Sequence, residues 1–140
     1  MPTTRETIAD MLAESTDLRN AGLSASQHSD DYNAVYQADT SDSPQEEFFL
    51  VLRWGKARAG MGRSNFNPLT IWCYGPIGNY TKLDRIASAA VAVLTGNDPI
   101  EKEGGWITQI RDLQRGPDAR DNGYQKAVVP YDLEVVASGI

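Results

Sequence analysis

The chain has 140 residues and a formal charge of −6, from 13 lysines and arginines against 19 aspartates and glutamates. This length fits a single domain, 1–140, that can bury a core without disulfides or metal ions. The lone cysteine and lone histidine exclude an internal disulfide, a multi-cysteine zinc site and a two-histidine metal motif. The net negative charge argues against a general DNA-binding protein, which needs clustered positive charge.

The sequence predicts no membrane segment and no leader. Its apolar runs stay well short of the roughly 20 residues that cross a bilayer. Glu6 and Asp10 lie where the apolar centre of a signal peptide would lie. We therefore expect a protein made in a reducing, cytosolic compartment.

The N-terminal segment predicts a helix over about 4–14. Thr3 and Glu6 have the spacing of a capping box, in which each side chain bonds a backbone N–H at the helix start. Apolar residues then follow at helical spacing. The next stretch, 24–45, is polar and contains few large apolar residues, so we expect a loop-rich segment that becomes ordered only in an assembly.

A second helix is predicted over 80–95. Its apolar residues form one continuous face, as in a helix that packs on a sheet. Asn79 or Thr81 can serve as the N-cap. Gly96 follows the last apolar residue, where a left-handed C-cap is common.

Four segments predict strands: 48–54, 69–74, 106–114 and 124–137, the last interrupted at Pro130. A connection rich in glycine, asparagine and basic residues joins the first two, and turn residues precede the last. The predicted fold is α+β, a mainly antiparallel sheet of about four strands flanked by two helices. In this arrangement helix 80–95 covers one face of the sheet and the N-terminal helix covers part of the other.

No motif predicts a catalytic, cofactor-binding or metal-binding site. Gly60 and Gly62 begin a dinucleotide fingerprint, but the third glycine is missing and no helix follows. The segment from Asp118 resembles a calcium loop only faintly, because a cation stands at its third position and no carboxylate closes it. Cys73 lies inside a predicted strand, which is more typical of a small buried residue than of a nucleophile.

Two features favour a contact surface. The connection between the first strands gathers positive charge in an acidic protein, at Lys56, Arg58 and Arg63. The predicted strands are apolar on both faces, with more aromatic surface than one short helix can cover, at Trp54, Trp72, Tyr74 and Trp106. An uncovered apolar face usually marks the binding surface for a partner.

Several strings between 46 and 137 stand in a characteristic order. Phe-Phe-Leu-Val-Leu-Arg-Trp-Gly at 48–55 precedes the basic loop, and Leu-Thr-Ile-Trp-Cys-Tyr at 69–74 precedes a short turn into a helix. A strand that begins at Trp106, the loop 118–124 and a closing strand follow. In this order the chain resembles the tail-terminator proteins of long-tailed bacteriophages with non-contractile tails, especially those that infect actinobacteria. Related chains often carry an arginine in the last strand, where this chain has Val129 and Pro130.

The resemblance implies a structural virion protein, with no enzymatic activity and no cofactor, assembled in the host cytoplasm. It implies a ring, typically of six copies, that caps the head-proximal end of the tail tube, ends tube polymerisation and joins the tail to the head connector. Its partners would be further copies of itself, the major tail tube protein and the connector, with genomic DNA passing through the lumen unbound. Six copies at −6 each would carry −36, a charge that disfavours adhesion to DNA.

A closed ring needs two different, complementary patches on each subunit. We predict that the aromatic residues and the basic loop named above contribute to these patches, together with Arg120 and Asp121 in the late loop. Two other functions remain open. One is a head-completion, connector or other minor tail protein, and the other is a small hydrolase or ligand-binding domain with a pocket beside 24–45.

Overall fold

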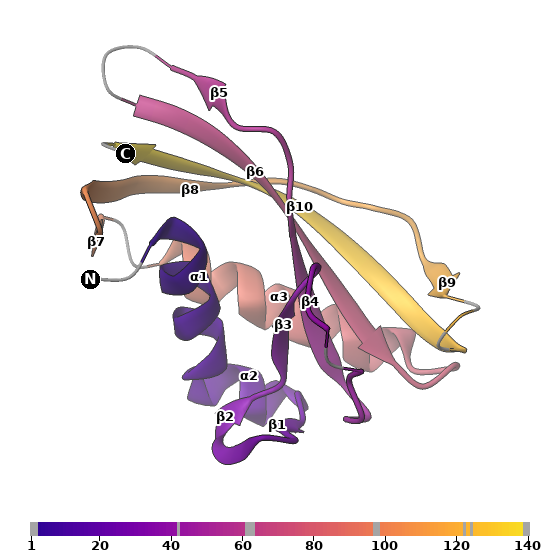
Figure 1. Ribbon diagram of the computed structural model, residues 1–140. Helices are drawn as coiled ribbons and strands as arrows, with labels where there is room; N and C mark the ends of the chain where they lie inside the picture. Colours follow the sequence, from indigo (N-terminus) through magenta and orange to yellow (C-terminus); the bar gives the residue numbers. More distant parts are fainter. Residues whose placement is uncertain are drawn as a thin grey trace.

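The computed structural model describes residues 3–41, 43–60, 64–96, 99–121, 123 and 125–138. Within these residues the chain forms three helices and ten strands (Figure 1). The helices are α1 (Thr4–Ala13), α2 (Thr16–Ala21) and α3 (Tyr80–Thr95). The strands are β1 (Ala25–Ser26), β2 (Ser29–Asn33), β3 (Val35–Gln37), β4 (Phe49–Trp54), β5 (Arg58–Ala59), β6 (Ser64–Gly75), β7 (Ile100–Lys102), β8 (Gly105–Arg115), β9 (Ala119–Asp121) and β10 (Lys126–Ser138).

Eight of these strands form one sheet, and β1 and β2 pair separately as a small hairpin. The order along the large sheet is β3-β4-β6-β10-β8-β7, with β5 paired to β6 and β9 paired to β10. The sheet is mixed, because β3 runs parallel to β4 while β6 and β10 run antiparallel to their neighbours. It curls into a half-barrel around the helices (Figure 1).

The predicted fold class is therefore wrong. The described chain is mostly β structure with three helices, not a four-stranded α+β sheet flanked by two. The four missed strands of the large sheet, β3, β5, β7 and β9, are only two or three residues long. Strands this short depend on a neighbouring strand rather than on their own sequence pattern.

The first helix begins as predicted. Thr3 and Glu6 form the capping box, with Thr3 Oγ1 accepting from the Glu6 backbone N–H. α1 ends at Ala13, and Ser15 then caps a second short helix, α2, that the sequence analysis missed. Gly22 closes α2 with a φ of 119°, a left-handed conformation that glycine adopts without strain.

The bounds of α3 match the predicted 80–95, but its caps differ. Gly96 has a φ of −90°, in the right-handed region, so the predicted left-handed cap is wrong. Asn79 holds the N-cap position without capping, because its side chain donates to the Pro76 carbonyl at 3.1 Å.

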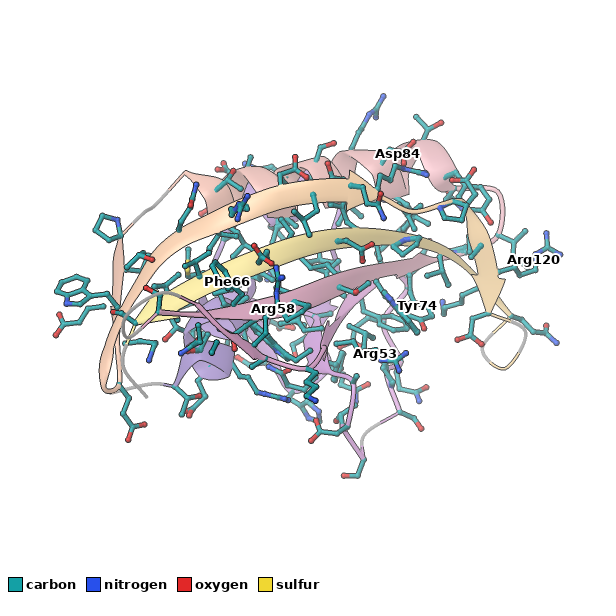
Figure 2. All side chains as sticks on the ribbon, turned by 90° about the horizontal axis from the view of Figure 1, so that it is seen from above. Arg53, Arg58, Phe66, Tyr74, Asp84 and Arg120 are labelled. Carbon is teal, nitrogen blue, oxygen red and sulfur yellow. The ribbon has the colours of Figure 1, made fainter. Side chains whose placement is uncertain are left out.

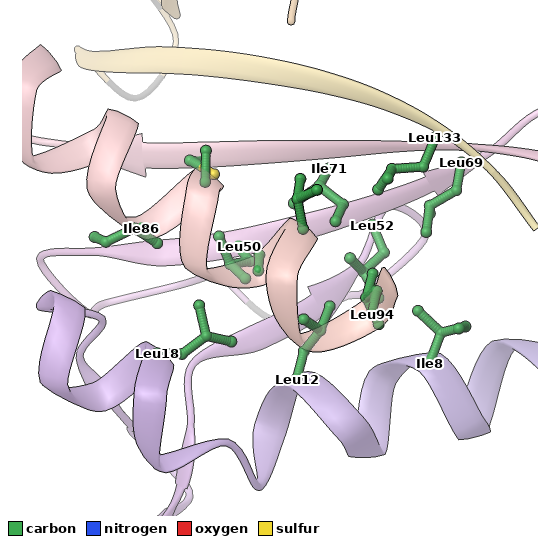
Figure 3. Packing of buried hydrophobic residues seen from close by; sticks show 14 of the residues in the cluster. Ile8, Leu12, Leu18, Leu50, Leu52, Leu69, Ile71, Ile86, Leu94 and Leu133 are labelled. Carbon is green, nitrogen blue, oxygen red and sulfur yellow. The ribbon is translucent and has the colours of Figure 1, made fainter. Parts of the chain in front are cut away.

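All three helices pack on the same face of the sheet, here called the inner face. Residues of α1, α2 and α3 share one buried cluster with alternate residues of β4, β6 and β10 (Figure 3). The labelled members of this cluster are Ile8, Leu12, Leu18, Leu50, Leu52, Leu69, Ile71, Ile86, Leu94 and Leu133, each fully buried. The prediction that the N-terminal helix covers part of the other face is therefore wrong. The other face, here called the outer face, therefore has no helix among the described residues.

The two long central strands, β6 and β10, pair with each other and with most of the other strands of the sheet. β6 and β10 pair without a break from Gly75 opposite Ala127 to Ser64 opposite Ser138. β6 thus begins five residues before the predicted 69–74, inside what looked like a loop. The pair is long enough to present both an inner row of aliphatic residues and an outer row of aromatic and polar ones.

Strand β10 continues through Pro130, so the predicted interruption there is wrong. Pro130 lies between the part of β10 that pairs with β8 and the part that pairs with β9. Its carbonyl accepts from the Gly116 N–H at 2.9 Å. In an antiparallel strand the N–H and the carbonyl of one residue point to the same side. At Pro130 that side is the break between β8 and β9, so the lack of an N–H there costs no hydrogen bond of the sheet.

Pro68 repeats this arrangement in β6. It lies between the residues of β6 that pair with β4 and those that pair with β5, and its carbonyl accepts from the Gly55 N–H at 2.9 Å. A Cβ added at Gly55 would stand 3.1 Å from Pro68 Cβ, so the close approach favours glycine. Each central strand therefore changes partner at a proline.

The polar segment 24–45 contains β1, β2 and β3, and Asn33 ties it to the helices. The Asn33 amide donates to the carbonyls of Leu12 and Ser15 at 2.9 and 2.7 Å. Its oxygen accepts from Arg19 Nε at 2.9 Å. One buried side chain thus joins the end of α1, the start of α2 and strand β2.

Candidate subunit interface

The outer face carries a small aromatic cluster of its own. Phe49 of β4 and Tyr74 of β6 stack with ring centroids 4.8 Å apart and planes 6° apart. Tyr36 of β3 meets the Phe49 ring edge-on at 6.2 Å, and Trp72 lies 6.4 Å from Tyr74. The period of two along a strand places these rings opposite the aliphatic inner row.

Two adjoining hollows flank Trp72 and Tyr74, and together they are here called the aromatic groove. One, of about 360 Å³, is also lined by β9 and by Val128 and Pro130 of β10. The other, of about 480 Å³, is also lined by Gln37 at the end of β3, by the chain that follows it, and by β4, including Arg53. Gln37 Oε1 is buried and has no hydrogen-bond partner among the described atoms.

Cations surround this groove in an otherwise acidic chain. The Arg53 guanidinium lies 5.7 Å from the centre of the Trp72 ring, and Lys126 Nζ lies 5.9 Å from that of Phe49. Arg120 is exposed on β9 (Figure 2). Asp121 is the acidic member, and its carboxylate accepts from the Tyr74 hydroxyl at 3.1 Å. The rim thus presents more positive than negative charge.

A second charged cluster lies farther along the outer face, around Glu134 of β10. This carboxylate is buried, and it pairs with Arg58 of β5 and with Arg111 of β8, the latter at 3.1 Å. The Arg58 guanidinium also lies 5.1 Å from the centre of the Phe66 ring, over which Figure 2 shows it. Arg58 therefore fastens β5 to the outer face, although two-thirds of its side chain, 66%, stays exposed.

The structure brings together four of the predicted contact residues, Trp72, Tyr74, Arg120 and Asp121, at the aromatic groove. The others are dispersed. Lys56 is exposed between β4 and β5, and Arg58 lies on the outer face. Trp54 packs against the helix-side core with Arg5 at 5.8 Å from its ring, and Trp106 is exposed at the start of β8. Arg63 lies outside the described residues.

Arg53 and Pro130 are two of the groove residues that were not predicted from the sequence. Arg53 follows Phe49 and Val51 at a spacing of two, which is the signal that it shares their face. Pro130 was taken as the end of a strand, so its place opposite Trp72 was not recognised. Both residues add to the contact surface around Trp72.

A larger hollow, of about 670 Å³, lies elsewhere, between the start of α1, Trp54 and the turn after β7. Glu103 is the one carboxylate among its described lining residues, so no acid–base pair converges there. Among the described residues no cluster of three metal-ligating side chains occurs. No helix in the described parts of the chain is long and apolar enough to span a membrane.

The described groups with shifted pKa values do not line any of these three hollows. Hydrogen bonds donated to Asp118 and Asp84 raise the pKa of Arg115. Burial, followed by the hydrogen bond to Asp112, raises the pKa of Tyr131. These groups fasten β8 to its neighbours in the sheet and to α3.

Cys73 is expected to be inert in the folded protein. Burial, followed by the charge of Asp84, raises the pKa of its thiol from 9.0 to about 12. At pH 8 only about one thiol in 10⁴ would be ionised, and thiolate is the reactive form. A thiol reagent at pH 8 should therefore label the native protein only as fast as it unfolds, and prompt labelling would contradict this.

The same shift predicts a dependence of stability on pH. Because the folded pKa lies above the unfolded one, the stabilising effect is complete below about pH 9 and is lost as the pH rises toward 12. The free energy of unfolding should therefore fall more between pH 8 and 10.5 in the wild type than in Cys73→Ala, measured by urea denaturation.

No protein-family model matches the chain, and no curated protein does. A solved structure does match. It is described as "Virion of native gene transfer agent (GTA) particle". The TM-score is 0.67 with 14% sequence identity, over 94% of this chain and 92% of that chain. Our chain shares that fold. At this identity the likeness concerns the fold, and it extends over nearly all of both chains.

Proposed function

We propose that the protein is a structural component of a phage-type virion, specifically the tail terminator. In this role a ring of copies, six in the simplest case, caps the head-proximal end of the tail tube. The ring stops polymerisation of the major tube protein and offers its other side to the head connector. The observation that supports this proposal best is the shared fold with a chain of the gene transfer agent particle, over almost the full length of both.

The surface chemistry agrees with a ring-forming subunit. The outer face has no helix among the described residues and carries the aromatic groove with its cationic rim. Exposed carboxylates of α1, α2 and β2 give another part of the same chain the opposite charge. Heterologous contacts that close a ring need two such unlike patches.

The alternative within a virion is a head-completion or connector protein, because the matched structure is a whole particle. The enzyme alternative has less support. The hollow of about 670 Å³ beside Trp54 has one carboxylate rather than a convergent pair among its described lining residues, and a catalytic pocket usually gathers several polar groups.

The test is capping of tail tubes. Purified protein, added in excess to polymerising tube protein of the same phage, is expected to shorten the tubes and to leave a ring at one end in negative-stain images. Light scattering behind a sizing column shows whether the ring forms without the tube. Tube protein alone is the control. Unaltered tube lengths together with binding to tail-less heads would assign the connector role instead.

A further inference from the structure

The strongest unexplained feature outside the outer face is the small hairpin of β1 and β2. It pairs apart from the large sheet and lies at the end of the molecule beside α2, away from β9 (Figure 1). Three successive residues of β2, Asp30, Asp31 and Tyr32, are exposed. Tyr32 keeps 47% of its surface accessible, among the largest exposures of any apolar side chain in the described chain.

The hairpin is held firmly enough to present these side chains. Asn33, the next residue, is buried and bonded to the ends of α1 and α2. Arg19 of α2 donates to the Asp30 carbonyl at 3.3 Å. An aromatic ring on such a support loses little conformational freedom when it binds, which is why tyrosine is frequent at binding hot spots.

We infer that Tyr32 of one copy inserts into the aromatic groove of the next copy, where it packs against Trp72 and Tyr74. Asp30 lies on the same side of β2 as Tyr32, about 6.7 Å away along the strand. It then meets the cationic rim, with Arg120 as its partner. This inference rests on the proposed ring, and it identifies the two unlike patches that the ring requires.

Charge and hydrogen bonding favour a second copy as the occupant. The groove has Arg53 and Arg120 at its rim, and the hairpin offers two exposed carboxylates beside the ring that would enter it. Gln37 lines the groove, and a turn of its side chain would bring its buried Oε1, which has no partner among the described atoms, to the incoming Tyr32 hydroxyl.

The hairpin and the groove lie on different parts of one chain, so the contact is head-to-tail. Each copy uses its hairpin on one neighbour and its groove on the other. Repetition of such a contact gives a ring when the rotation closes. The same contact therefore supplies the assembly that the proposed function needs.

Single substitutions with matched controls test the contact. Tyr32→Ala and Arg120→Glu are compared with Ile77→Ala and Arg85→Glu, which make the same kind of change at exposed positions outside both patches. The readouts are the concentration for half-assembly by light scattering and ring formation at tube ends. We expect the two test variants to need about tenfold more protein, or to fail to assemble. The controls should behave as the wild type does.

Exchanging the charges of Asp30 and Arg120 shows whether these two residues contact each other directly or whether each substitution weakens assembly for another reason. Asp30→Arg alone should weaken assembly, and Asp30→Arg with Arg120→Glu should recover most of it. A cysteine pair gives a second measurement, because Cys73 is buried. Oxidation of the double variant Asp30→Cys, Arg120→Cys, which keeps Tyr32, should link successive copies into a ladder, and Ile77→Cys, Arg120→Cys should not. Near-UV circular dichroism confirms that each variant is folded.

The outcomes distinguish the inference from the function on which it rests. Wild-type rings at tube ends, with test variants that assemble as well as the controls, would overturn the contact and leave the tail-terminator proposal standing. Wild-type protein that neither assembles nor caps tubes would overturn both. Rings lost in the test variants, and recovered by the charge exchange, would support both.

Discussion

Replacing Ile71 by alanine is expected to lower the free energy of unfolding by about 3 kcal/mol. Ile71 lies in the middle of β6, fully buried, with Leu52 of β4 and Tyr131 of β10 as its neighbours across the sheet. The helices cover this face, so the space left by the lost methyl groups cannot fill by a small local movement. Urea denaturation at neutral pH measures the change.

Ile77→Ala is the matched control, because it makes the same chemical change at a side chain that is 46% exposed. Its expected effect is below about 0.5 kcal/mol. Equal losses in the two variants would mean that the inner face is not the packed core described above.

Asn33→Ala is expected to cost about 2 to 3 kcal/mol, although the residue is polar and small. Its amide bonds the carbonyls of Leu12 and Ser15, and its oxygen accepts from Arg19. Removal would take these short bonds from both carbonyls and leave the Leu12 carbonyl with the long bond from the Ser15 N–H, at 3.4 Å. Denaturation curves give the loss, and hydrogen exchange should show faster exchange in α2 and β2 than in β6.

Two comparisons limit the interpretation of that result. Asn20→Ala, at an exposed position of α2, should change stability by less than about 0.5 kcal/mol. Asn33→Asp keeps the shape but loses the donated bonds, so it should resemble the alanine variant. A stable Asn33→Asp protein would show that these bonds do not hold the hairpin.

The sequence predicted the elements that carry a strong periodic pattern. α1 and α3 follow from apolar residues at helical spacing, and the inner rows of β4 and β6 follow from alternation. The packing of α1 did not follow, because an amphipathic helix specifies that one face is buried but not which surface buries it. The short strands did not follow either, because two or three residues contain no usable period.

The contact surface could be predicted only where its residues lie on a strand with a clear alternating pattern. Trp72 and Tyr74 stand on one face of a recognisable strand, so their proximity follows from the sequence. Arg120 and Asp121 join them only because β9 pairs with β10, the strand that follows it, and three residues are too few to show a strand pattern. Trp54 was misplaced, since its strand parity puts it with Leu50 and Leu52 on the helix side.

At Pro68 strand β6 changes its partner from β4 to β5, and at Pro130 strand β10 changes its partner from β8 to β9. The sheet therefore consists of a continuous β6–β10 ribbon with a short strand attached at each end. β6 and β10 keep each other paired along their full length, whereas β9 is held by three residue pairs and β5 by two. Short attached strands open with a lower free energy than the body to which they are joined. The aromatic groove consequently has its floor, Trp72 and Tyr74, on the continuous ribbon and one wall on β9, a short strand that hydrogen bonds from the Tyr74 and Tyr80 hydroxyls hold in place.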